Sequence, residues 1–171
     1  MAKKILVVDD EPSIVRLLKA RLEASQYKVI TAKDGQEALD KTSQEKPDLI
    51  ILDIMLPKID GYTVASMLKS DEKTRDIPIV MLTARNLAQD IKAGMESGAV
   101  SYVQKPFNSD VLLGMIPTLI NRKKRKEKER REEAGAGARD DVQGENEEED
   151  INKEIRDIYT IMGKFDGKDK D

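Results

Sequence analysis

The chain has 171 residues, a formal net charge of −3 at pH 7, and neither cysteine nor histidine. This composition excludes disulfides, thiol chemistry and any histidine used in catalysis or metal binding. No apolar run reaches the roughly 18 residues that a membrane helix needs, and the residues before the first apolar run, at Ile5, are too few for a signal peptide. We therefore expect a soluble cytoplasmic protein without a membrane partner.

Short apolar segments alternate with segments of helical periodicity through the first two thirds of the chain. The expected strands are Lys4–Val8, Tyr27–Thr31, Asp48–Asp53, Ile77–Thr83 and Val100–Gln104. The expected helices begin near Glu11, Asp34, Gly61, Asn86 and Asn108. This alternation predicts right-handed crossovers and a parallel sheet. Pro117 lies within the last of these helices, where it should cost about 3 kcal/mol or kink the helix.

Beyond Asn121 the chain becomes strongly charged. We divide it into a globular domain at 1–122, a charged helix extension and disordered acidic linker at 123–150, and an amphipathic docking helix at 151–163. The docking target is left open between a partner, a second copy and the domain's own surface. The basic run at 122–131 is interleaved with glutamates, which favours a solvated helix over a surface that binds nucleic acid.

The stretch around Asp53 combines a buried strand with a charged residue at its end. Leu49–Leu52 is an apolar run between Pro47 and Pro57, typical of a strand buried on both faces of a parallel sheet. Asp53 would then lie at the carboxyl end of that strand, the edge where open α/β sheets bind ligands. A carboxylate buried there needs a partner for its charge.

Other polar side chains follow neighbouring strands at the same expected edge. They are Asp9, Asp10, Thr83 and Lys105. Clustered carboxylates raise one another's pKa, which a hard cation such as Mg²⁺ would relieve. A carboxylate can also attack phosphorus and become an acyl phosphate, while a metal ion and a lysine hold the phosphoryl oxygens. The pattern therefore predicts a phosphoryl-transfer site with Asp53 as the acceptor.

Four motifs in this order resemble the receiver domain of the two-component response regulator family, in its chemotaxis-regulator-like form. They are Val8-Asp9-Asp10, Asp53-Ile-Met-Leu-Pro57 with Asp60-Gly61, Met81-Leu-Thr83-Ala84, and Tyr102-Val-Gln-Lys105-Pro106-Phe107. The resemblance implies a flavodoxin-like, doubly wound α/β fold with a five-stranded parallel sheet in the order 2-1-3-4-5.

The resemblance also implies roles for individual residues. Asp53 would be the phosphoacceptor, assisted by Lys105 and Thr83, and Thr83 and Tyr102 would form the conformational switch. Mg²⁺ would be bound by Asp10, Asp53 and the backbone carbonyl of Met55, with Asp9 acting through water. Because Met55 offers no acid or amide to position an attacking water, we expect a long-lived acyl phosphate.

We expect a phosphoaspartate-dependent signalling switch that is phosphorylated by a histidine kinase or phosphotransfer protein. Through Thr83 and Tyr102 it would change the binding of an unidentified protein partner or form a phosphorylation-dependent homodimer. We expect no recognisable DNA-binding output domain, no nucleic-acid partner, and no enzyme activity beyond self-catalysed phosphotransfer and autodephosphorylation. One alternative is a transcriptional regulator that binds nucleic acid through residues 122–131. Another is a HAD-type phosphatase, which would need an aspartate where Met55 stands.

Overall fold

The computed structural model describes residues 1–84 and 101–135. Its centre is a five-stranded parallel sheet with the order β2-β1-β3-β4-β5. The strands are β1 (Lys4–Val8), β2 (Lys28–Ala32), β3 (Leu49–Asp53), β4 (Ile79–Thr83) and β5 (Ser101–Gln104). The predicted α/β fold and strand order are therefore confirmed. Strand β4 begins after Pro78 rather than before it, because proline has no N–H for the ladder, although its carbonyl accepts a bond of 3.0 Å from Ile50.

The core lies on both faces of the central strands. Every residue of β3 and β4 is buried, which explains why both strands are continuous apolar runs rather than alternating ones. Register places Val7 beside Ile51, and Ile51 beside Val80. Each such side chain contributes about 1.5–3 kcal/mol when it is fully buried, so the carboxyl ends of these strands are held in fixed positions.

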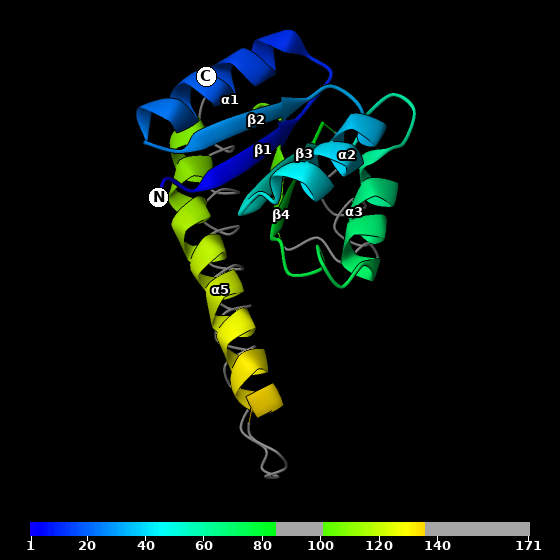
Figure 1. Cartoon of the computed structure of the whole chain (residues 1–171). Helices are drawn as coiled ribbons and strands as arrows, with labels where there is room; N and C mark the ends of the chain where they lie inside the picture. The colour runs from blue at the N-terminus through cyan, green and yellow to red at the C-terminus, as the bar shows by residue number, and fades with distance from the viewer. Residues whose placement is uncertain (85–100, 136–171) are drawn as a thin grey trace. The chain divides into compact units, whose positions relative to one another are not determined.

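Helices cover the two faces of the sheet (Figure 1). Helices α1 (Pro12–Ala24) and α5 (Ser109–Gly135) lie on one side, and α2 (Gly35–Glu45) and α3 (Gly61–Ser70) lie on the other. Asp34 and Asp60 cap α2 and α3 by accepting bonds from the third residue of each helix. The helix expected from Asn86 lies outside the described residues.

Helix α5 continues without a break through Pro117 and past residue 122. Pro117 lies on the exposed side of the helix, so water can bond the carbonyl of Leu113 that proline leaves without a helical partner. Near the end of the helix, the guanidinium of Arg130 forms a bidentate ion pair with Asp76, in the segment before β4. The chain divides into two compact units, Met1–Arg131 and Glu132–Asp171, and the expected docking helix at 151–163 lies outside the described residues.

Asp48 connects the amino end of the chain to the start of β3. Its carboxylate accepts a bond of 2.8 Å from the backbone N–H of Lys4 and pairs with the Lys3 ammonium at 3.1 Å. This attachment lies at the edge of the sheet opposite to Asp53, since β3 runs between the two aspartates. Among the residues that the structure describes, none of the helices has the length and apolarity required to cross a membrane.

Candidate functional site

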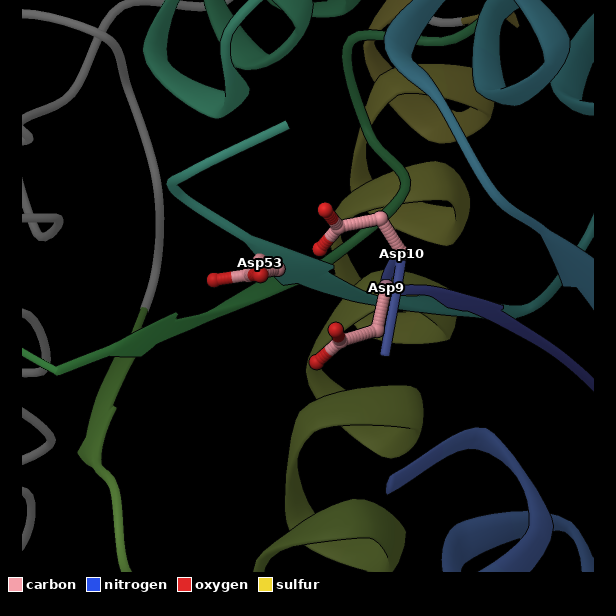
Figure 2. A group of neighbouring side chains, drawn as sticks. All are labelled: Asp9, Asp10 and Asp53. Atoms are coloured by element: carbon pink, nitrogen blue, oxygen red, sulfur yellow. The ribbon is translucent and has the colours of Figure 1, made fainter. Parts of the chain in front are cut away.

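Three aspartates meet at the carboxyl edge of the sheet (Figure 2). Asp9 and Asp10 follow β1, Asp53 is the last residue of β3, and these two strands are paired in register up to Val8 and Leu52. One carboxylate oxygen of each aspartate lies within 4.8 Å of the others. Asp9 and Asp53 are buried and Asp10 is exposed, so the cluster is open to solvent on one side.

Lys105 supplies the positive charge of the site. Its Nζ lies 2.7 Å from Asp9 Oδ2 and 3.4 Å from Asp53 Oδ2. The residue follows β5 directly, forms a cis peptide bond with Pro106, and donates its backbone N–H to the carbonyl of Thr83 at 2.6 Å. Thr83 itself is buried at the end of β4, so the neighbouring ends of β3, β4 and β5 bring Asp53, Thr83 and Lys105 to one edge.

The charges of Asp9, Asp53 and Lys105 shift the ionisation of Asp53 and Lys105. Burial, followed by the negative charge of Asp9, raises the pKa of Asp53 to about 6, although Lys105 acts in the opposite direction. Burial alone would lower the pKa of Lys105, but its hydrogen bond to Asp9 and the charges of Asp53 and Asp9 raise it. Among the residues that the structure describes, three carboxylates face one ammonium, which leaves an excess of negative charge, and the atoms that could bind a cation are oxygens. This donor set fits a hard divalent cation.

A cleft of about 600 Å³ opens beside Asp53. It is lined by Asp10, Asp53, Ile54, Met55, Leu56, Pro57, Asp60 and Tyr62. The Met55 side chain is 54% exposed at this cleft, and its backbone N–H lies 3.4 Å from Asp53 Oδ1. The arrangement leaves room for a phosphoryl group to reach Asp53 from solvent.

Glycine is required where α3 begins next to the site. A Cβ on Gly61 would lie 2.3 Å from the carbonyl oxygen of Asp53, so no side chain fits there. From the sequence, Asp60 and Gly61 were predicted only as part of a motif, and Tyr62 was not predicted to lie at the site. The signal that was available is the short connection between Asp53 and the helix, which brings the first turn of α3 to the cleft.

Not every predicted residue lies at the edge itself. Tyr102 is buried within β5 and pairs in register with Met81, two residues before Thr83. The structure thus brings Asp9 and Asp53 into contact with Lys105 and places Asp10 beside them, while Tyr102 lies deeper in the sheet. The roles of Thr83 and Tyr102 as a switch, and of the Met55 carbonyl as a ligand, stay predictions.

A doubly wound sheet in the order β2-β1-β3-β4-β5, with three aspartates and a lysine at its carboxyl edge, defines the class of receiver domains. The family model of the response regulator receiver domain matches residues 5–117. The chain therefore belongs to this family, and the predicted family is confirmed.

Two curated relatives and one solved structure are also similar to the chain. The chain is 50% identical over 122 residues to the alkaline phosphatase synthesis transcriptional regulatory protein PhoP of Bacillus subtilis, which covers 71% of this chain and 50% of PhoP. It is 44% identical over 119 residues to the DNA-binding dual master transcriptional regulator RpaA of Synechocystis, covering 70% and 49% of the two chains. It also resembles the receiver domain of sensor histidine kinase PA1611 from Pseudomonas aeruginosa, a structure with a magnesium ion coordinated in the active site cleft. That likeness has a TM-score of 0.66 and 30% identity, over 71% of this chain and 99% of the other.

These relatives correct one prediction. The expectation of a switch without a DNA-binding output domain is contradicted, because the relatives are transcriptional regulators and RpaA is named as DNA-binding. The chain spans about half the length of these curated relatives. The charged segment after residue 122 was interpreted as the output, and the residues of the receiver domain do not indicate which output domain accompanies them. The expectation that the basic run at 122–131 does not bind nucleic acid stays a prediction.

Proposed function

We propose that the chain is the phosphoryl-accepting receiver module of a response regulator that controls transcription, with Asp53 as the acceptor. The observation that carries this proposal is the position of the buried Asp53 carboxylate, 3.4 Å from the Lys105 ammonium and beside Asp9 and Asp10. The transcriptional output is proposed from PhoP and RpaA, whose names describe transcriptional regulators.

The chemistry follows from the groups at the edge of the sheet. A carboxylate oxygen of Asp53 attacks the phosphorus of a phosphohistidine on a histidine kinase or phosphotransfer protein. An O–P bond forms, the P–N bond breaks, and the imidazole of the donor leaves and takes up a proton. Lys105 compensates the charge on the phosphoryl oxygens, and Thr83 donates its hydroxyl to one of them. The module thus catalyses its own modification and subsequent hydrolysis rather than a metabolic reaction.

Mg²⁺ is the proposed cofactor, and Asp10, Asp53 and the Met55 carbonyl would hold it, with Asp9 acting through water. Bound there, the ion would neutralise the carboxylates and the developing phosphoryl charge. The oxygen-only donor set supports this choice, as does the magnesium ion described in the PA1611 receiver domain.

The response to phosphorylation is proposed to run through Thr83 and Tyr102. Thr83 would move toward the phosphoryl group, and Tyr102 would then change its packing within β5, which shifts the population between two conformations. A phosphorylation-dependent homodimer, a docking role for 151–163 and a cytoplasmic location stay predictions.

The decisive experiment is phosphorylation with a small-molecule acyl phosphate and Mg²⁺, followed by intact-mass and peptide mass spectrometry. We expect one phosphoryl group on Asp53 in the wild type and none on this position in Asp53→Asn. Asp40→Asn, on the exposed face of α2, is the matched control and should be modified normally. Phosphorylation of Asp53→Asn to the wild-type level would contradict the proposal.

A further inference from the structure

The segment between Asp53 and α3 has an unusual backbone for its sequence. Lys58 has φ of 68°, in the left-handed region that a residue with a side chain rarely adopts. On either side, Ile59 donates its N–H to the carbonyl of Pro57 at 2.9 Å, and Gly61 donates to the carbonyl of Ile54 at 2.9 Å. A backbone of this kind persists only when its surroundings hold it in place.

The first of these surroundings is the amino end of α2. A Cβ on Gly35 would lie 2.2 Å from the carbonyl oxygen of Ile59 and 2.8 Å from its Cβ, so the segment rests directly on the glycine. The backbone N–H of Gly35 also points to the carbonyl of Pro57, at 3.5 Å. Helix α2 and the segment after Asp53 therefore pack closely at Gly35, with no room for a side chain on that residue.

The second of these surroundings is the buried carboxylate of Asp34, which contacts both α2 and the segment after Asp53. Asp34 is 4% exposed; its Oδ1 accepts a bond of 2.8 Å from the N–H of Glu37, and its Oδ2 lies 3.1 Å from the Lys58 ammonium. The bond from the Glu37 N–H, aided by Lys58, holds the pKa of Asp34 below its usual range, so the carboxylate is charged. One oxygen caps α2 and the other binds the left-handed residue.

We propose that the corner formed by Asp34 and Gly35 positions the segment that carries Met55, and thereby sets the affinity of the site at Asp53 for Mg²⁺. Neither residue lines the cleft, so both act as positioning residues through Lys58 and Ile59. The inference deepens the proposed function and rests on it for the identity of the metal and for Met55 as one of its ligands. A support of this kind for metal ligands typically changes affinity by about 10- to 100-fold when it is removed.

The first test replaces Gly35 by alanine and uses Gly114→Ala as the matched control. A Cβ on Gly114, in α5, would have no neighbour within 4 Å. In metal-free protein we expect Gly35→Ala to speed hydrogen exchange of the peptide that contains the Ile59 and Gly61 amides, and we expect titration calorimetry to show Mg²⁺ binding about tenfold weaker. Gly114→Ala should change neither. Wild-type exchange and wild-type Mg²⁺ affinity in Gly35→Ala would overturn the proposal.

The second test removes the charge pair and decides the question if Gly35→Ala does not fold. Asp34→Asn keeps an oxygen for the Glu37 N–H but loses the charge that binds Lys58, and Lys58→Gln removes the other charge. We expect both to speed exchange of the Ile59–Gly61 amides and to weaken Mg²⁺ binding, with the double variant no worse than either alone. Glu45→Gln is the control, because it breaks an ion pair of 3.0 Å with Lys4 away from the cleft.

Different results would contradict the positioning role of Asp34 and Gly35 and the phosphoryl transfer to Asp53. Unchanged exchange and Mg²⁺ affinity in Asp34→Asn and Lys58→Gln would overturn the positioning role. Tight Mg²⁺ binding that depends on Asp34, in a protein that acyl phosphate never modifies at Asp53, would support the positioning role and contradict phosphoryl transfer.

Discussion

The Lys105 ammonium lies closer to Asp9 than to Asp53, at 2.7 Å against 3.4 Å. In the absence of a phosphoryl group, this lysine therefore mainly compensates a fully buried carboxylate, since the Asp9 side chain is 0% exposed.

Removing the lysine should destabilise the metal-free protein. We expect Lys105→Met to lower the free energy of unfolding by about 3 kcal/mol, because it leaves Asp9 buried without its cation. Denaturant unfolding in the presence of a chelator measures this loss. Lys3→Met is the control: Lys3 is half-exposed and pairs with Asp48, so it should cost less than about 1 kcal/mol. Equal effects of the two substitutions would contradict the buried-pair explanation.

Stability of the metal-free protein should depend on the ionisation of Asp53. Its pKa of about 6 in the folded state exceeds the value of about 3.9 in an unfolded chain, so folding favours the protonated form. The stability from this residue is fully present below about pH 4 and is lost as the pH rises through 6. Asp53→Asn should therefore match the wild type at pH 4 and exceed it above pH 6 by about 2 kcal/mol, allowing for partial screening.

Denaturant unfolding with chelator at several pH values measures this difference, and Asp40→Asn provides the control on the exposed face of α2. A constant offset between Asp53→Asn and the wild type from pH 4 to 8 would show that Asp53 is not the titrating group.

The lifetime of the acyl phosphate should be set partly by Met55. Its exposed side chain lines the cleft but has no group that can orient an attacking water. We expect Met55→Asn to speed the decay of phosphorylated Asp53 by about tenfold, through an amide that positions the water. Decay can be followed by mass spectrometry after removal of the phosphodonor. Met67→Asn is the matched control, since Met67 is 49% exposed on α3 outside the cleft lining. Equally fast decay in the wild type and Met55→Asn would reject this explanation.

The bidentate pair of Arg130 with Asp76 should hold the last turns of α5 in place. Arg130→Gln should speed hydrogen exchange at the peptide around residues 124–131 and leave the peptides of β3 and β4 unchanged. The loss in global stability should stay below about 1 kcal/mol, because Arg130 is exposed. Lys124→Gln, an exposed substitution on the same helix, controls for the change of charge. Unaltered exchange in Arg130→Gln would mean that helix propensity alone maintains this region.

Much of the fold follows from local patterns. Leu49–Leu52 predicted a strand buried on both faces, and the structure buries the whole of β3. Because strands alternate with helices, their carboxyl ends must share one edge, so the sequence alone predicts that Asp9, Asp53 and Lys105 lie together. Apolar residue type alone was less reliable on α1, where Leu17 is 46% exposed.

The positioning of the Asp53 segment could not be predicted in the same way. Asp34 and Gly35 indicated a turn into a helix, and nothing local connects them with Lys58. Their contact depends on the packing of α2 against the segment before α3, and the left-handed backbone at Lys58 is imposed by that packing rather than by residue type. Pro117 lies within one continuous helix, α5, and on its exposed side, so the expected cost or kink at this residue stays a prediction.

The attachment of the amino end by Asp48 has a practical consequence for studying this module. Strand β1 separates Lys4 from Asp9 by about 16 Å, at 3.3 Å per residue. A surface linker or fluorophore placed before Met1 would thus be anchored at the amino edge, a full strand length from the acidic cluster. Sensor chips and single-molecule tethers that hold the protein by its N-terminus should leave Asp53 accessible to a phosphodonor.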